Sequence, residues 1–279
     1  MSARQLLSTQ VRKECCFADC LLKVNGLCKC FSKAKAGQQI LRELSFVLNK
    51  GEILGVLGQS GCGKSTLAKC LTGLTIPEKG EVLYHNQDIS KLQGKKRLWV
   101  CGKMQIIMQD ARASLNPRRP ALELVKEPLN YLHLGTAAER EEKAQYYLQQ
   151  VGITKELQNK RAPQLSTGQC QRVAIARALV VEPDLLVCDE AVSALDMILQ
   201  KQILELIKKL QKKFGFAIIM ISHDIRVIRN FCHHVAVMKD GRFLEKLPTN
   251  RLTVSGSSEY VRNLLACEIE MKNEELEGG

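Results

Sequence analysis

A glycine-rich segment near residue 60 has the residue types of a phosphate-binding loop. It reads Gly58, Gln59, Ser60, Gly61, Cys62, Gly63, Lys64, Ser65 and Thr66, and so satisfies the pattern G-x-x-x-x-G-K-[ST]. Glycines let successive backbone N–H groups turn inward around phosphate oxygens, and a following helix points its positive end at them. We expect this loop to bind a nucleoside triphosphate, with Lys64 reaching its β- and γ-phosphates and Ser65 ligating Mg²⁺.

Two adjacent acidic residues end an apolar run later in the chain. Asp189 and Glu190 directly follow residues 185–188, which are Leu, Leu, Val and Cys. A phosphate loop hydrolyses nothing without an acid that positions the metal and a group that acts on the attacking water. Asp189 is suited to the Mg²⁺ shell, and Glu190 to the general base. Two adjacent acids at the start of a loop are common, so this pair indicates a catalytic site only together with the motifs around it.

The elements that must position these groups are short runs that are apolar on both faces. They cover residues 52–57, 185–188, 217–221 and 235–238, with two further short strands expected at 21–24 and 44–48. Such runs are typical of strands buried in a parallel sheet. Helical patterns at 171–180 and 198–214 lie between them. Alternating strands and helices predict a doubly wound α/β core.

The middle of the chain has a different pattern. Residues 116–163 contain no strand pattern, and 121–134 and 137–151 look helical on either side of Gly135. We therefore expect a helical subdomain inserted into the core. The remaining divisions that we expect are an N-terminal extension at 1–20, a nucleotide-binding domain at 21–245 and a C-terminal tail at 246–279 with a short helix around 260–269.

The charge balance favours acidic partners. The 279 residues include 41 Lys and Arg against 29 Asp and Glu, a net charge of +12, which suits nucleotides, nucleic acid or an anionic membrane surface. Lysines gather at 91–103 and along the helical pattern at 198–214. Solvated faces near anionic headgroups explain them better than nucleic-acid binding, because aromatic residues make up only 5% of the chain and no recognition module is visible.

Neither a membrane span nor a secretory signal is evident in the sequence. No apolar run approaches the 18 residues that a span needs, and residues 1–14 lack the apolar stretch of a signal peptide. We expect a cytosolic chain with reduced thiols. Five of its 12 cysteines crowd one N-terminal stretch, namely Cys15, Cys16, Cys20, Cys28 and Cys30. Their spacing matches no established metal-ligand pattern, so ordinary thiols are the favoured interpretation over a metal or iron–sulfur site.

Three further short motifs surround the acid pair. Residues 165–169 read Leu-Ser-Thr-Gly-Gln, 193–196 read Ser-Ala-Leu-Asp, and 222–224 read Ser-His-Asp. With the phosphate loop and Gln109, they occur in the order found in the ATP-binding-cassette (ABC) ATPases, which the chain resembles over about residues 21–245. The resemblance implies a P-loop NTPase fold: a mostly parallel sheet with flanking helices, an antiparallel N-terminal β part and an inserted α-helical subdomain.

The resemblance also implies roles for individual residues. Gln109 would touch Mg²⁺ and link the core to the helical insertion, and His223 would contact the γ-phosphate. Phe31 would stack on adenine, although an ordinary buried Phe is the alternative. Ser166, Gly168 and Gln169 belong to the signature, which would contact ATP bound to the opposite subunit of a dimer. Thr167 replaces the first Gly of the usual Leu-Ser-Gly-Gly-Gln, so its side chain either crowds that contact or is tolerated at a helix start.

Within the family, residues 109–118 look like the Q-D-x-x-x-S-L-N-P-R stretch of peptide and nickel importers, and the acid pair followed by Ala191-Val192 looks closest to the nickel-type subunit. The resemblance implies ATP hydrolysis with Mg²⁺, driving import of nickel, a metal chelate or a peptide. The implied partners are a second, different ABC ATPase subunit, two integral-membrane permease subunits and an extracytoplasmic substrate-binding protein. The chain would sit at the cytoplasmic face of the plasma membrane. The alternative is a non-transport cassette that acts on nucleic acid or ribosomes.

Overall fold

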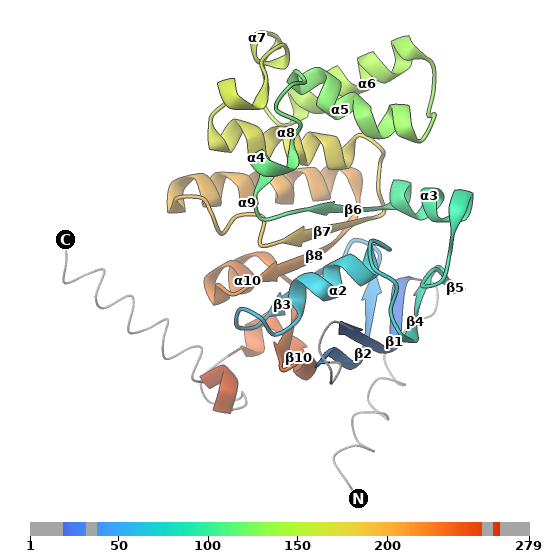
Figure 1. Ribbon diagram of the computed structural model, residues 1–279. Coiled ribbons are helices and arrows are strands. Elements are labelled where there is room, and N and C mark those ends of the chain that lie inside the picture. The colour runs from blue at the N-terminus through green and yellow to red at the C-terminus, as the bar shows by residue number, and fades with distance from the viewer. Residues whose placement is uncertain (1–18, 32–37, 253–258, 263–279) are drawn as a thin grey trace, which may run out of the picture.

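A computed structural model describes residues 19–31, 38–252 and 259–262, and its centre is a six-stranded sheet in the order β10-β9-β3-β8-β7-β6 (Figure 1). The strands are β3 (Ile53–Leu57), β6 (Met104–Ile107), β7 (Leu185–Asp189), β8 (Ala217–Ser222), β9 (His234–Lys239) and β10 (Arg242–Pro248). Every neighbouring pair is parallel except β9 and β10. The mostly parallel sheet expected from the apolar runs is therefore confirmed.

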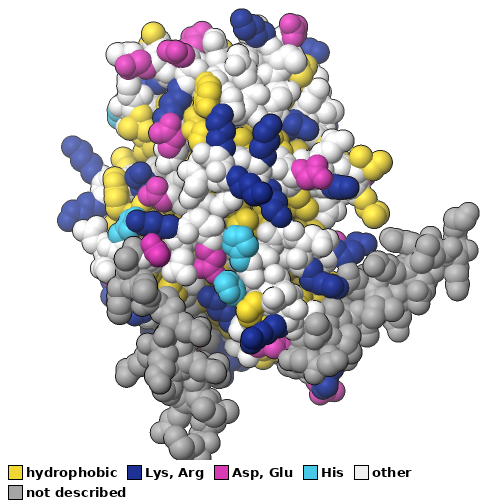
Figure 2. Space-filling view, turned by 180° about the vertical axis from the view of Figure 1, so that it is seen from behind, with side chains coloured by type: hydrophobic (Ala, Val, Ile, Leu, Met, Phe, Trp, Pro, Cys, Tyr) yellow, Lys and Arg dark blue, Asp and Glu magenta, His cyan; other side chains and the backbone are white. Residues whose placement is uncertain are grey.

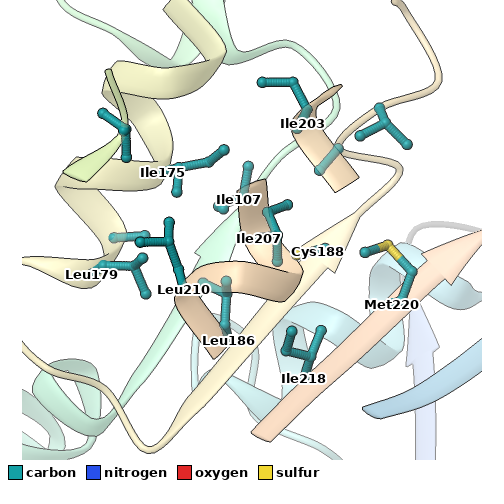
Figure 3. Packing of buried hydrophobic residues seen from close by; sticks show 14 of the residues in the cluster. Ile107, Ile175, Leu179, Leu186, Cys188, Ile203, Ile207, Leu210, Ile218 and Met220 are labelled. Carbon is teal, nitrogen blue, oxygen red and sulfur yellow. The ribbon is translucent and has the colours of Figure 1, made fainter. Parts of the chain in front are cut away.

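The central strands are apolar on both faces because both faces are covered. On β7, Leu186 and Cys188 pack into one hydrophobic cluster, while Leu185 and Val187 pack into another on the opposite face. The first cluster includes side chains of α8 (Thr167–Leu179), α9 (Met197–Phe214) and α10 (Ile225–Phe231), as Figure 3 shows for α8 and α9. The second includes α2 (Lys64–Leu71). This burial on two sides fixes the strands whose ends carry the motifs.

An antiparallel sheet in the order β2-β1-β4-β5 forms the N-terminal β part. Its strands are β1 (Cys20–Phe31), β2 (Gln38–Asn49), β4 (Lys79–Tyr84) and β5 (Gln87–Asp88). β1 and β2 are much longer than the runs expected at 21–24 and 44–48. Polar residues alternate with apolar ones along them, since one face packs on the core while the other is wet, so a search for continuous apolar runs misses most of each strand.

The helical subdomain lies above the sheet in Figure 1 and contains no strand, only an isolated bridge between Pro120 and Arg161. It comprises α5 (Ala121–Tyr131), α6 (Ala137–Gln150), α7 (Lys155–Gln158) and a 3₁₀ turn, η1 (Ala162–Gln164). A capping box between Thr136 and Glu139 starts α6. α5 ends at Tyr131, three residues before the expected 134, and His133 then takes a left-handed φ of 55° that cannot continue a helix.

The shorter elements are α3 (Gly94–Lys103), α4 (Ala111–Ser114) and η2 (Thr249–Arg251). β10 runs through residue 245, so the sheet continues into the segment that the sequence assigned to the tail. Of the helix expected around 260–269, residues 259–262 are described as a helical turn; the rest lies outside the described residues, as do residues 1–18 with Cys15 and Cys16. Within the described residues, none of the helices is both long and apolar enough to span a bilayer.

The basic excess is spread over the surface. Lys208, Lys209, Lys212 and Lys213 are exposed on α9, whose buried side chains are Ile203, Ile207 and Leu210. On the face drawn in Figure 2, Lys and Arg side chains lie from top to bottom with acidic side chains among them. The α9 lysines therefore occupy the solvent face of an amphipathic helix, as the sequence favoured.

Candidate active site

The phosphate loop connects β3 to α2 in a sharp turn that glycine makes possible. Gly63 directly precedes α2 with a φ of 107°, a region that L side chains rarely adopt. A Cβ at Gly63 would also lie 2.9 Å from the Ile40 carbonyl oxygen. The loop therefore passes close to β2 before the helix begins, and the N-terminus of α2 points its free N–H groups into the loop.

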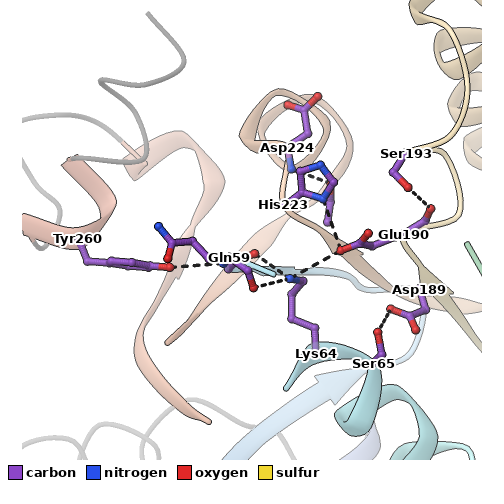
Figure 4. Close-up of polar contacts among 11 residues, drawn as sticks. Gln59, Lys64, Ser65, Asp189, Glu190, Ser193, His223, Asp224 and Tyr260 are labelled. Atoms are coloured by element: carbon purple, nitrogen blue, oxygen red, sulfur yellow. Dashed lines mark hydrogen bonds and ion pairs between the residues drawn. The ribbon is translucent and has the colours of Figure 1, made fainter. Parts of the chain in front are cut away.

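Lys64 lies inside this loop and is only 4% exposed. Its Nζ donates to the carbonyl oxygens of Gly58 (2.7 Å) and Gln59 (2.9 Å), and it lies 3.7 Å from Glu190 Oε1 (Figure 4). The ammonium is thus held by the loop backbone on one side and by a carboxylate on the other. A cation in this position can form an ion pair with a phosphate group that binds in the loop.

Glu190 and His223 meet beside Lys64. Glu190 Oε1 lies 3.4 Å from His223 Nδ1, and the Glu190 side chain is 17% exposed. The Glu190 backbone has a left-handed φ of 50°, which is unusual for a residue other than glycine. The Glu190 N–H donates to the Ile221 carbonyl (3.1 Å), and Ser193 Oγ donates to the Glu190 carbonyl (2.9 Å). These bonds hold a strained turn that aims the carboxylate at two basic side chains.

Ser65 and Asp189 form the second pair of the site. Ser65 Oγ donates to Asp189 Oδ1 at 3.1 Å. Burial raises the pKa of Asp189, and the neighbouring Glu190 adds to the rise, while the Ser65 bond and the Lys64 charge act in the opposite direction. A hydroxyl and a carboxylate are the hard oxygen ligands that Mg²⁺ prefers, and a divalent cation would relieve the cost of the buried charge. The pair therefore fits a Mg²⁺ site.

Strand order brings these groups together. β3, β8 and β7 are adjacent and parallel, so the loop after β3, the acids at the end of β7 and His223 after β8 meet at one edge of the sheet. The sequence predicted these residues individually. Their contacts depend on β8 lying between β3 and β7, which the linear order β3, β7, β8 does not reveal.

Other predicted residues do not join this cluster. Gln109 follows β6 and is exposed, and among the described residues it makes no polar contact with Ser65 or Asp189. Phe31 ends β1, and its side chain lies outside the described part. Cys28 and Cys30 are free thiols. Within the ranges that the structure describes, no group of three or more His, Cys, Asp or Glu side chains could hold a metal ion.

The signature residues form a helix start of their own. Ser166 caps α8: its Oγ accepts from Gln169 N (3.2 Å), while Gln169 Oε1 accepts from Ser166 N (2.9 Å). The cap is therefore Ser166, and Thr167 is the first helical residue, with an exposed side chain. A Cβ at Gly168 would lie 2.7 Å from Leu199 Cδ1, so α8 and α9 pack closely at this glycine.

Sequence reasoning missed two sets of polar contacts around the site. Arg112 Nη2 donates to the Leu165 carbonyl (2.7 Å), and Arg177 Nη1 donates to the Ser114 carbonyl (2.8 Å). These bonds tie the segment after Gln109 to both ends of α8. The second set is a hydrogen bond from Gln59 N to the Tyr260 hydroxyl (3.4 Å). The sequence singled out Arg112 only as part of the matching stretch at 109–118, and Tyr260 only as part of the helix expected around 260–269.

A phosphate loop after a buried strand, an acid pair at the end of one parallel strand and a histidine at the end of the next define a P-loop ATPase. Comparisons with known proteins agree. Residues 41–193 match the family model described as ABC transporter. The nickel import ATP-binding protein NikE of Escherichia coli O6:K15:H31 is 41% identical over 229 residues, 82% of this chain and 85% of that protein. NikE of Shigella flexneri is 41% identical over 215 residues, 77% of this chain and 80% of that protein.

Solved structures give the same result. A dimeric ATP-binding cassette, MJ0796, in a post-hydrolysis state with ADP and Pi has a TM-score of 0.75 and 30% identity, covering 82% of this chain and 99% of that chain. CbiO1 of Clostridium perfringens, part of the ABC transporter complex cbiONQ, has a TM-score of 0.75 and 30% identity, covering 88% and 94%. The chain belongs to the ABC transporter family, and it is an ATPase that binds and hydrolyses ATP.

Proposed function

We propose that this chain is the ATP-hydrolysing motor subunit of a binding-protein-dependent importer whose cargo is nickel or a metal chelate. The observation that carries the motor role is the cluster of Lys64, Glu190 and His223 beside the Ser65–Asp189 pair. The cargo rests on relatives named nickel import ATP-binding proteins, which are 40–41% identical over about four-fifths of the chain.

In this proposal the loop from Gly58 to Thr66 binds the phosphates of ATP, and Lys64 reaches the β- and γ-phosphates while its ammonium group still donates to the Gly58 and Gln59 carbonyls. Ser65 and Asp189 would hold Mg²⁺, with Gln109 joining them, and the bound ion would supply positive charge opposite the phosphate oxygens. Glu190 takes the proton of the attacking water, and His223, 3.4 Å from it, contacts the γ-phosphate and fixes the carboxylate.

The assembly that we propose is a dimer with a second, different ABC ATPase subunit, docked on two permease subunits that receive cargo from an extracytoplasmic binding protein. Ser166, Gly168 and Gln169 would meet ATP held by the other subunit, which agrees with their separation from the Lys64 cluster. Residues 109–118 and the helical subdomain would face the permeases. The Arg112 and Arg177 bonds support this arrangement, because they would transmit a shift of this segment to α8.

The test uses cells in which the chromosomal copy carries Glu190→Gln, with Glu205→Gln as the matched control. Glu205 is exposed on α9, outside the helical subdomain. Because the amide cannot accept the water proton, the ATPase rate of the assembled transporter should fall on the order of a hundredfold or more while ATP binding persists. Nickel accumulation should fall in parallel, and Glu205→Gln should behave as the parent.

The outcomes separate the alternatives. Loss of dipeptide uptake with normal nickel accumulation would make the cargo a peptide. Unchanged uptake of both would remove the transport role. ATP turnover at the parent rate by the Glu190→Gln transporter would overturn the assignment of the general base, whatever the cargo.

A further inference from the structure

The helical turn at residues 259–262 lies beside the phosphate loop (Figure 4). The Tyr260 hydroxyl accepts a hydrogen bond from the backbone N–H of Gln59 at 3.4 Å, across 201 positions of sequence. The turn is anchored next to this contact. Val261 is fully buried in the larger hydrophobic cluster, and Lys239 Nζ lies 4.9 Å from the centroid of the Tyr260 ring. The hydroxyl is therefore presented to the loop by a side chain that is fixed on two sides.

The bond to Gln59 acts on Lys64 through the peptide group between Gly58 and Gln59. The Gln59 N–H and the Gly58 carbonyl belong to one planar trans peptide group, so the two point in opposite directions and turn together. The Gly58 carbonyl accepts from Lys64 Nζ at 2.7 Å. Fixing the N–H on the Tyr260 side thus fixes the carbonyl on the Lys64 side.

We propose that Tyr260 is a positioning residue of the ATP site, which orients the Gly58–Gln59 peptide and through it the ammonium group of Lys64. This inference rests on the proposed role of Lys64 in binding phosphate. The Tyr260 phenol is neutral at physiological pH, and burial raises its pKa further, so the group keeps its O–H while its oxygen accepts from Gln59. Residues 259–262 are in this way part of the nucleotide site.

Removal of the hydroxyl should leave the peptide free to turn, because water would replace a partner held in place by Val261 and Lys239. Nucleotide binding must then also order the loop, and the conformational entropy lost by the loop lowers the affinity. A single hydrogen bond of ordinary net strength corresponds to an affinity loss of about two- to tenfold. Since this interaction is the same in the ground state and the transition state, KM should rise with kcat unchanged.

The experiment compares full-length Tyr260→Phe with Tyr131→Phe, a control on α5 whose side chain is 68% exposed. Calorimetric titration with Mg²⁺ and ADP gives the Kd, hydrogen exchange of peptides covering residues 57–63 reports the loop amides, and thermal unfolding reports global stability. For Tyr260→Phe we expect a two- to tenfold higher Kd and faster loop exchange. A merely structural role would lower Tm without this selective change at the loop.

Lys64→Ala separates the inference from the function on which it rests. If Lys64→Ala binds ADP as tightly as the parent chain, the proposed site itself is wrong. If Lys64→Ala loses affinity while Tyr260→Phe matches Tyr131→Phe in Kd and in loop exchange, the site stands and the positioning role of Tyr260 is overturned.

Discussion

Replacement of Gly58 by alanine tests how tightly the phosphate loop is packed against the sheet. A Cβ at this position would lie 2.4 Å from the Met238 carbonyl oxygen of β9 and 2.8 Å from Cys62 Sγ. Gly58 does not have a left-handed backbone, so the substitution introduces crowding without conformational strain. Gly55→Ala is the matched control: three residues earlier on β3, its Cβ would meet side-chain atoms of Ile228 at 2.8 and 3.0 Å.

The geometry sets the magnitude. Contacts of a Cβ below 3.0 Å are essentially never observed, so the Gly58→Ala backbone must move by at least 3.0 − 2.4 = 0.6 Å away from a strand that cannot rotate aside. Overpacking of a core costs about 1–3 kcal/mol, and a clash with backbone should reach the upper end, about 3 kcal/mol. For a chain of this size that lowers Tm by about 6–12 °C. Gly55→Ala should cost less, about 1–2 kcal/mol, because the Ile228 side chain can change rotamer.

Thermal unfolding and calorimetric ADP titration check both variants. Gly58→Ala should lose stability and most of its ADP affinity together, because the same 0.6 Å shift moves the carbonyl that holds Lys64. Gly55→Ala should lose stability alone and bind ADP as the parent chain does. A Gly58→Ala chain with parental Tm and parental ADP affinity would refute the close packing of the loop against β9.

The remaining predictions concern the acid pair and the signature. Asp189→Asn should raise the Tm of the nucleotide-free chain at pH 7 while abolishing Mg²⁺-dependent ATPase activity. The reason is that burial raises the folded-state pKa of Asp189 above the unfolded value of 3.8, so its carboxylate costs stability above the folded pKa, and that cost disappears as the pH falls below 3.8. Tm measured from pH 3 to 8 should therefore show the two chains converging at the acid end; a difference that persists there would contradict this account. Thr167→Gly should leave the ATPase rate of the assembled transporter unchanged, since Thr167 is an ordinary exposed first residue of α8. A higher rate would instead show that its side chain crowds the opposing nucleotide.

The sequence by itself determined the identity of the chemical groups. The phosphate loop, the acid pair and His223 are each contiguous with the strand that ends beside them, and a continuous apolar strand is readable because both of its faces are buried. Parallel strands end at one edge of a sheet, so groups that follow such strands converge there. The residues of the Lys64 cluster could therefore be predicted without knowledge of the strand order.

Only the tertiary structure decided how these groups meet and what holds them. The placement of β8 between β3 and β7 brings His223 to Glu190, and the left-handed Glu190 turn aims the carboxylate at Lys64. The Tyr260 bond to Gln59 spans 201 positions and has no local signal, because a single hydroxyl gains its partner from the packing of Val261 and from the path of β9 and β10. Local residue types predict which face of a strand or helix is buried. A contact between distant segments forms only after the intervening strands have packed in one order.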